Sequence, residues 1–158
     1  MSAFVESPKR SKLVVLVLTL LTLLAGCGPV RLVSPYDQVV DEGVTAFHTH
    51  VTAFVGKMEA LAGKPEGSYE ANKASYPDLN AELSSLKMRA TQTPLNDSTV
   101  KSLDELIGNV EQLRKLHDSG GDKGLFPALA EPALKAIDVQ CESILKLEIA
   151  KRRGEEPK

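Results

Sequence analysis

A cysteine that follows a short apolar segment is the residue of this sequence best placed for covalent chemistry. Cys27 lies three residues after the uncharged run LVVLVLTLLTLL at residues 13–24, and residues 1–12 carry a net basic charge. Twelve apolar residues are too few to cross the hydrocarbon layer of a membrane, which takes about 20. A basic start, a short apolar core and small residues before Cys27 together predict a cleaved export signal peptide.

The four residues Leu24-Ala25-Gly26-Cys27 resemble the lipobox of bacterial lipoproteins. This resemblance implies cleavage between Gly26 and Cys27, transfer of a diacylglycerol to the Cys27 sulfur and acylation of the new amino terminus. A thiolate is a nucleophile and forms a stable thioether, and several acyl chains make attachment effectively permanent. Gly28 resembles the outer-membrane class of these lipoproteins, which faces the periplasm. The alternative interpretation is an ordinary signal peptide that ends near a cysteine.

The chain that would remain after cleavage has the size and composition of one small globular domain. Removal of residues 1–26 from the 158-residue chain takes away three of 19 basic and one of 21 acidic residues, so 132 residues remain, 16 basic and 20 acidic. This mild negative charge argues against a nucleic-acid partner. We expect four parts: a signal peptide at 1–26, a lipidated tether at 27–34, a helical domain at 35–153 and a tail at 154–158.

Apolar residues recur at helical spacing in four segments of the expected domain. The segments are 35–61, about 68–92, from Asn96 or Ser98 to Gly120, and a stretch within 126–152. Ser34 is the predicted N-cap of the first helix and Pro35 its first residue. Pro77 predicts a kink or break in the second segment, with Tyr76 displaced from helical angles. Pro132 fits the first turn of the fourth helix. The predicted fold is all-α, an antiparallel up-and-down four-helix bundle with short loops.

Most other reactive side chains favour structural roles. Cys141 lies on the apolar stripe of the fourth segment, where we expect a buried, unreactive thiol. His48 and His50 are two residues apart on a helix and therefore point to different faces, so no metal site is expected. His117 falls in the last turn of the third helix, where the helix dipole favours a positive charge.

A basic run, Lys151-Arg152-Arg153, ends the fourth segment. One interpretation is that these residues stabilise the negative end of the helix dipole. The other follows from the antiparallel topology, which brings the end of the last helix beside the start of the first. There the run, together with Arg31, would contact anionic lipid headgroups. Glu148 and Arg152 are four residues apart and predict an ion pair on a solvent-exposed face.

These observations favour a non-enzymatic lipoprotein of the bacterial cell envelope. Its helical domain would bind another envelope protein or serve a structural role at the periplasmic face of the membrane. No catalytic motif is recognisable, and beyond the covalent lipid on Cys27 we expect no metal and no cofactor. The alternative is a domain that binds a small ligand in a cavity near Tyr69 and Tyr76, since a bend at Pro77 can hold neighbouring helices apart.

Overall fold

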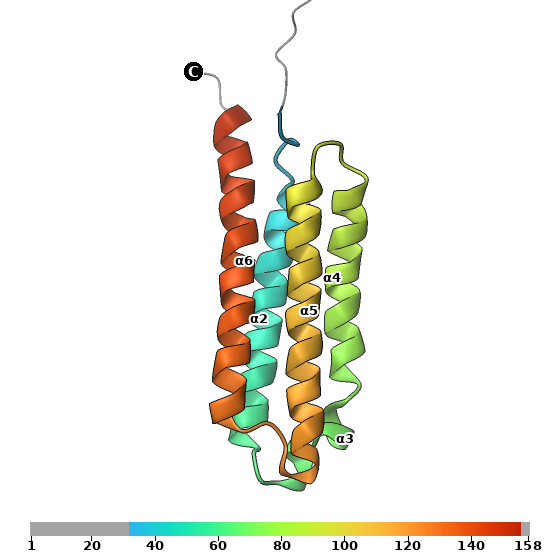
Figure 1. Cartoon of the computed structure of the whole chain (residues 1–158), viewed down its shortest axis with the longest axis vertical. Coiled ribbons are helices and arrows are strands. Elements are labelled where there is room, and N and C mark those ends of the chain that lie inside the picture. Colours follow the sequence, from blue (N-terminus) through green and yellow to red (C-terminus); the bar gives the residue numbers. More distant parts are fainter. Residues whose placement is uncertain (1–31, 156–158) are drawn as a thin grey trace, which may run out of the picture. The chain divides into compact units, whose positions relative to one another are not determined.

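Four long helices lie side by side in the computed structural model, which describes residues 32–155 (Figure 1). They are α2 (Gln38–Ala60), α4 (Ser75–Thr91), α5 (Asp97–Gly120) and α6 (Pro127–Glu155). The connections hold the one-turn helix α3 (Tyr69–Asn72) and two 3-10 turns, η1 (Pro65–Gly67) and η2 (Gly121–Lys123). The described residues contain no strand, and the predicted all-α class is confirmed.

Each long helix packs against two others through one apolar stripe. Helix α2 contacts α4 and α6, and α5 contacts the same two helices. The fully buried apolar side chains of these helices are Val40, Val44, Phe47, Val51, Val55, Met58, Tyr76, Leu79, Leu83, Ala90, Leu103, Leu106, Val110, Leu113, Ala130, Ile137 and Ile144. Each large one contributes about 1.5–3 kcal/mol of burial free energy. The three- and four-residue spacing seen in the sequence therefore marks the core.

Helix α2 begins three residues later than predicted, with Asp37 rather than Ser34 as its N-cap. The Asp37 carboxylate accepts hydrogen bonds from the backbone N–H groups of Val39 (2.9 Å) and Val40 (3.4 Å). The Ser34 hydroxyl is used elsewhere, since it donates to Asn96. The prediction of Ser34 as the cap is wrong because Asp37 is an equally good cap that can also form an ion pair.

The break in the second segment falls before Pro77 rather than at it. Helix α3 ends at Asn72 and α4 begins at Ser75, so Pro77 is the third residue of α4. The first N–H groups of a helix have no intrahelical acceptor, and a proline costs little there. Tyr76 was expected to leave helical geometry, but it lies within α4 and is fully buried.

Helix α6 contains Pro132 in its interior, contrary to the prediction that this proline lies in the first turn. The helix starts at Pro127, so Pro132 is its sixth residue. Pro132 has no N–H to donate to the carbonyl of Ala128. Both residues are exposed, so water can hydrogen-bond to that carbonyl. The helix continues to Glu155, two residues beyond the predicted end of the domain.

The lengths and hydropathies of the helices also bear on membrane insertion. Within residues 32–155, every helix is too short or too polar to cross a bilayer.

Candidate functional site

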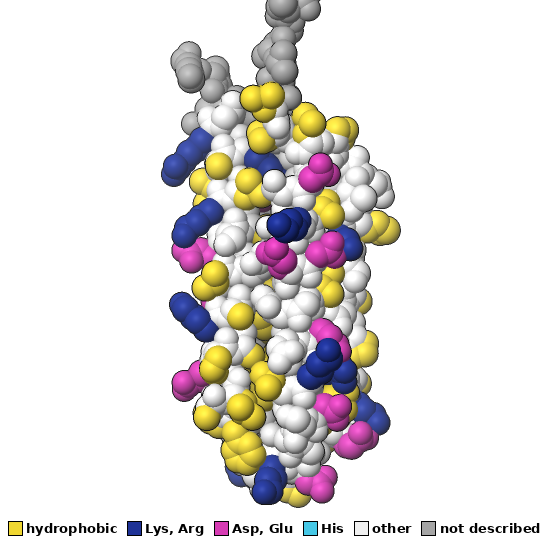
Figure 2. Space-filling view, in the orientation of Figure 1, with side chains coloured by type: hydrophobic (Ala, Val, Ile, Leu, Met, Phe, Trp, Pro, Cys, Tyr) yellow, Lys and Arg dark blue, Asp and Glu magenta, His cyan; other side chains and the backbone are white. Residues whose placement is uncertain are grey.

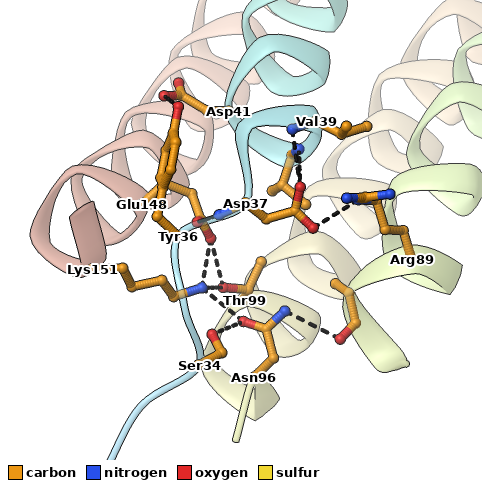
Figure 3. Close-up of polar contacts among 12 residues, drawn as sticks. Ser34, Tyr36, Asp37, Val39, Asp41, Arg89, Asn96, Thr99, Glu148 and Lys151 are labelled. Atoms are coloured by element: carbon orange, nitrogen blue, oxygen red, sulfur yellow. Dashed lines mark hydrogen bonds and ion pairs between the residues drawn. The ribbon is translucent and has the colours of Figure 1, made fainter. Parts of the chain in front are cut away.

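Buried polar side chains from the N-terminal segment, the α4–α5 connection and the helices α5 and α6 meet where α2 begins (Figure 3). Together with Arg89, whose side chain is half exposed, they form a group that we call the polar cluster. Its members are Ser34, Asp37, Arg89, Asn96, Thr99, Glu148 and Lys151. Buried charges are rare in proteins unless they are paired. Each buried charge of the cluster therefore needs a partner within it.

Lys151 and Glu148, three residues apart on α6, form the centre of the polar cluster. The Lys151 ammonium is 2.6 Å from Glu148 Oε1, 2.7 Å from Asn96 Oδ1 and 2.8 Å from Thr99 Oγ1. These three contacts use all three of its N–H donors. The Thr99 hydroxyl in turn donates to Glu148 Oε1 at 3.2 Å. Both charges are buried, and each is satisfied within the protein.

The same cluster holds the segment that leads into α2. The Ser34 N–H donates to the carbonyl of Leu95 (3.1 Å), and the Ser34 hydroxyl donates to Asn96 Oδ1 (2.8 Å). The Asn96 amide also donates to the carbonyl of Ala90 at the end of α4 (3.1 Å). The N-terminal segment is thus bonded to the α4–α5 connection, with Asn96 as the shared partner.

Asp37 links the cluster to α4 and α6. Its backbone N–H donates to Glu148 Oε2 (3.1 Å), and its carboxylate accepts from Arg89 Nε (2.7 Å). Burial on its own would raise the pKa of Asp37, but the hydrogen bonds from Arg89 and from the Val39 N–H outweigh burial. The net result is a lowered pKa. Asp37 is therefore held as a carboxylate by the groups around it.

The predicted basic run contains one buried residue and two exposed residues. Lys151 is 5% exposed and fully bonded within the polar cluster, so it is removed from the predicted membrane-contact set. Arg152 and Arg153 are exposed, and the Arg152 guanidinium lies 5.4 Å from the centre of the Tyr36 ring. The predicted pair of Glu148 with Arg152 on a solvent face is wrong, because Glu148 is fully buried and paired with Lys151.

Three other predicted site residues, Gly26, Cys27 and Arg31, lie outside the residues that the structure describes.

A different cluster surrounds His117 near the opposite helix ends. The Tyr76 hydroxyl donates to His117 Nδ1 (2.8 Å), and His117 Nε2 donates to the carbonyl of Gly67 (2.9 Å). The rings of Tyr76, Phe54 and Tyr69 pack around it, with centroids 5.3–6.1 Å apart. We call these four residues the aromatic cluster. The predicted ligand cavity near Tyr69 and Tyr76 stays a prediction.

The remaining predicted residues lie apart from both clusters. His48 contacts Asp138 of α6 (2.8 Å), whereas His50 contacts Glu82 of α4 (2.7 Å), so the two histidines bridge α2 to different neighbours. Among residues 32–155 no group of three or more side chains is arranged to hold a metal ion. Cys141 is buried as predicted, and burial raises its pKa to about 12.

Two open surface grooves lie beside the start of α2. One, of about 630 Å³, is lined by residues that include Tyr36, Asp41 and Arg152. The other, of about 430 Å³, is lined by residues that include Tyr36 and Arg89. Arg89 forms an ion pair with Asp37, Asp41 accepts a hydrogen bond from the Tyr36 hydroxyl, and the exposed Arg152 lies over the Tyr36 ring.

Comparison with protein-family models, with curated proteins and with solved structures gives no match to this chain. The polar cluster is saturated: the Lys151 ammonium, the Glu148 carboxylate and the Asn96 amide each bond to protein groups. Such an arrangement suits fixing the N-terminal segment to the helices.

Sequence reasoning missed the polar cluster, although the signal for it was present. The apolar stripe of α6 contains Ile137, Cys141 and Ile144, and the same spacing of four and three residues continues to Glu148 and Lys151. That continuation places the two charges on the buried face, three residues apart. This spacing was overlooked because Lys151 was interpreted as part of one basic run with Arg152 and Arg153.

Proposed function

We propose that this chain is a lipoprotein of the bacterial cell envelope with a non-enzymatic helical domain that binds another envelope protein or serves a structural role. The observation that carries the proposal is Leu24-Ala25-Gly26-Cys27, which follows a basic start and a twelve-residue apolar run. Cys27 would carry a thioether-linked diacylglycerol and an acylated amino terminus. Gly28 favours the outer membrane, with the domain facing the periplasm.

The topology that we propose for the domain is an antiparallel up-and-down four-helix bundle. It is supported by the residues that each cluster brings together. The polar cluster joins the starts of α2 and α5 to the ends of α4 and α6. The aromatic cluster joins the C-terminal half of α2, through Phe54, and the last turn of α5, through His117, to the first turn of α4, through Tyr76. Short connections between consecutive helices also suit neighbours that run antiparallel.

The segment that leads to Cys27 enters the domain at the end that holds the polar cluster, through Ser34. Ser34 is seven residues after Cys27, so at about 3.4 Å per residue the tether reaches at most roughly 24 Å. The Ser34 contacts to Leu95 and Asn96 fix the point at which the tether meets the helices. A short tether with a fixed attachment point favours a role close to the membrane, such as positioning a partner protein there.

The buried charges support a structural role over catalysis. A catalytic acid or base needs access to a substrate, whereas Glu148 is fully buried and bonded to Lys151, Thr99 and the Asp37 N–H. Breaking such a pair for chemistry would leave a buried charge without its partner, at a cost of about 3–5 kcal/mol.

Metabolic labelling with a fatty acid tests the anchor. Cells expressing the full chain should incorporate label into this protein, and Cys27→Ser should abolish incorporation because the thioether cannot form. Cys141→Ser is the matched control, since it removes the buried cysteine and should leave labelling unchanged. Labelling that persists in Cys27→Ser, or is absent from the wild type, would contradict the proposal.

Crosslinking in intact cells tests whether the domain binds another envelope protein. The protein is then purified from detergent-solubilised envelopes. A protein recovered in stoichiometric amount with the wild type is expected. The same protein should be lost from Cys27→Ser, because that variant is no longer held at the membrane. If no stoichiometric protein is recovered, the structural role remains and the interaction role is wrong.

A further inference from the structure

Leu95, in the connection between α4 and α5, has an unfavourable backbone conformation and an exposed side chain. Its φ angle is 61°, the only positive value for a residue other than glycine among residues 32–155. This conformation crowds the Cβ atom of an L-residue, so turns of this kind usually carry glycine or asparagine. The Leu95 side chain is 57% exposed, so packing within the domain does not account for it. An apolar side chain kept in such a position points to a contact outside the domain.

The residues around Leu95 extend this apolar tip. Val33 is 55% exposed and is adjacent in space, because the following residue, Ser34, donates its N–H to the Leu95 carbonyl. Pro94 is also exposed. Met88, in the last turn of α4, is 63% exposed. Figure 2 shows hydrophobic side chains at the upper end of the view, the end at which α5 begins in Figure 1.

Basic side chains lie beside this tip. Lys151 bonds to Asn96, the residue after Leu95, so the end of α6 lies at the same turn. The next residues of α6, Arg152 and Arg153, are exposed. Asp97 is exposed as well and reduces the local positive charge. Two arginines beside an apolar tip match an interface of anionic headgroups over acyl chains.

We propose that Leu95, flanked by Val33 and Pro94, inserts into the interface of the bilayer to which the lipid on Cys27 is attached. Arg152 and Arg153 lie at the headgroups. The inference rests on the proposed lipid anchor, which limits the distance: six residues separate Cys27 from Val33 and span at most roughly 20 Å. Helix α5 is about 36 Å long at 1.5 Å per residue, which is more than this tether can span.

Fluorescence quenching by brominated lipids tests this contact, because the chain has no tryptophan of its own. The variants are Leu95→Trp and, as the matched control, Leu129→Trp. Leu129 is also a partly exposed leucine, 42% exposed, but it lies in the first turn of α6 at the other end of the domain. Each variant is purified from membranes and reconstituted into vesicles of phosphatidylethanolamine and phosphatidylglycerol with brominated acyl chains.

The expected result is a blue-shifted emission and strong quenching for Leu95→Trp, with neither for Leu129→Trp. Equal quenching of both variants, quenching of the control alone, or quenching of neither would overturn the inference. If neither variant is quenched, the apolar tip contacts a protein partner rather than the bilayer. Fatty-acid label is measured on the same preparations, so a missing anchor is recognised separately and the comparison between the variants still decides the contact.

A second variant keeps the inference testable if the indole perturbs the turn. Leu95→Asn suits the left-handed backbone, so its thermal unfolding midpoint should equal or exceed that of the wild type. Hydrogen exchange is compared between detergent and vesicles for the peptide that contains residues 93–97. Vesicles should slow exchange of the wild type and have no effect on Leu95→Asn. Protection that is equal in both proteins would overturn the inference.

Discussion

The two ends of the helical domain bury polar side chains in different ways. At one end, the polar cluster contains a lysine and a glutamate that are 2.6 Å apart and excluded from solvent. At the other end, the aromatic cluster contains the hydrogen bonds that link Tyr76, His117 and the Gly67 carbonyl. Ion pairs demand complete pairing because an isolated buried charge costs far more than an isolated hydroxyl.

This difference follows from what each end must connect. The polar cluster joins residues far apart in sequence, with Ser34, Asn96 and Lys151 in direct contact. The aromatic cluster instead fills the space beside the break between α3 and α4, where the Gly67 carbonyl needs a donor. Both clusters join several segments, the polar cluster through a buried ion pair and the aromatic cluster through packed rings and a hydrogen-bonded histidine.

The largest effect is expected for Lys151→Met, which removes the positive charge and leaves the Glu148 carboxylate buried. We expect a loss of about 3–5 kcal/mol in the free energy of unfolding, measured by urea denaturation followed by circular dichroism. Arg153→Met is the control, since Arg153 is exposed, and it should change stability by less than about 0.5 kcal/mol. Similar values for both variants would show that the ion pair does not set the stability of this end.

A smaller effect is expected at the aromatic cluster. Tyr76→Phe keeps the ring but removes the hydroxyl that donates to His117 Nδ1. A buried acceptor then lacks its donor, at a cost of about 1–2 kcal/mol. Tyr69→Phe removes a hydroxyl that accepts a bond from the partly exposed Arg114, and it should cost less. If Tyr76→Phe costs as much as Lys151→Met, the contrast between the ends is wrong.

The pH dependence of stability should distinguish the two ends at Asp37. The pKa of Asp37 is lowered from its ordinary value of 3.8, since the hydrogen bonds from Arg89 and Val39 outweigh burial. A carboxyl with a lowered pKa contributes stability above its ordinary pKa, and this contribution is lost as the pH falls through the folded value.

The wild type should therefore lose more stability than Asp37→Asn when the pH falls from about 5 to about 3. At neutral pH the variant should differ by less than about 1 kcal/mol, because Arg89 is half exposed. Asp122→Asn, an exposed site in η2 at the other end, should follow the wild type. Parallel curves for all three proteins would contradict the role given to Asp37.

The fourth test measures a labelling rate rather than a stability, and it uses Cys141 as a reporter between the two ends. Burial, aided by the charge of Asp138, raises the pKa of its thiol to about 12. Only about one-thousandth of the usual thiolate fraction then remains, so a thiol reagent should label native Cys141 very slowly. In a Cys27→Ser background, Lys151→Met should accelerate labelling more than Tyr76→Phe, because Lys151 fixes α6 whereas the aromatic cluster contains no α6 residue. Equal acceleration would mean that both ends hold α6 alike.

The helices and their buried faces could be predicted from the sequence because they depend on local periodicity. The stripe Val40, Val44, Phe47 and Val51 in α2 is buried as its spacing indicates. The ends of helices were harder to predict. Ser34 and Asp37 are both good N-caps, and the choice between them depends on Arg89 and Asn96, which lie more than 50 residues away.

The polar cluster could be predicted only in part, for a related reason. The spacing along α6 places Glu148 and Lys151 on the buried face, but lysine and glutamate are usually surface residues and the spacing does not identify the partners that satisfy them. Their burial follows from Thr99 and Asn96 on another part of the chain, which provide the acceptors that the Lys151 ammonium needs. The Tyr76–His117 bond likewise joins residues 41 apart, a distance that no local pattern spans.

The hydrogen bonds of Ser34 also determine how the domain would respond to a mechanical load. Tension applied from the amino-terminal side reaches Ser34 before it reaches α2, and there it is shared with Leu95 and Asn96 through two hydrogen bonds. Asn96 passes part of that load to α6 through Lys151. Pulling would have to break these hydrogen bonds together before α2 could unwind turn by turn. The attachment therefore resists force from the amino-terminal side.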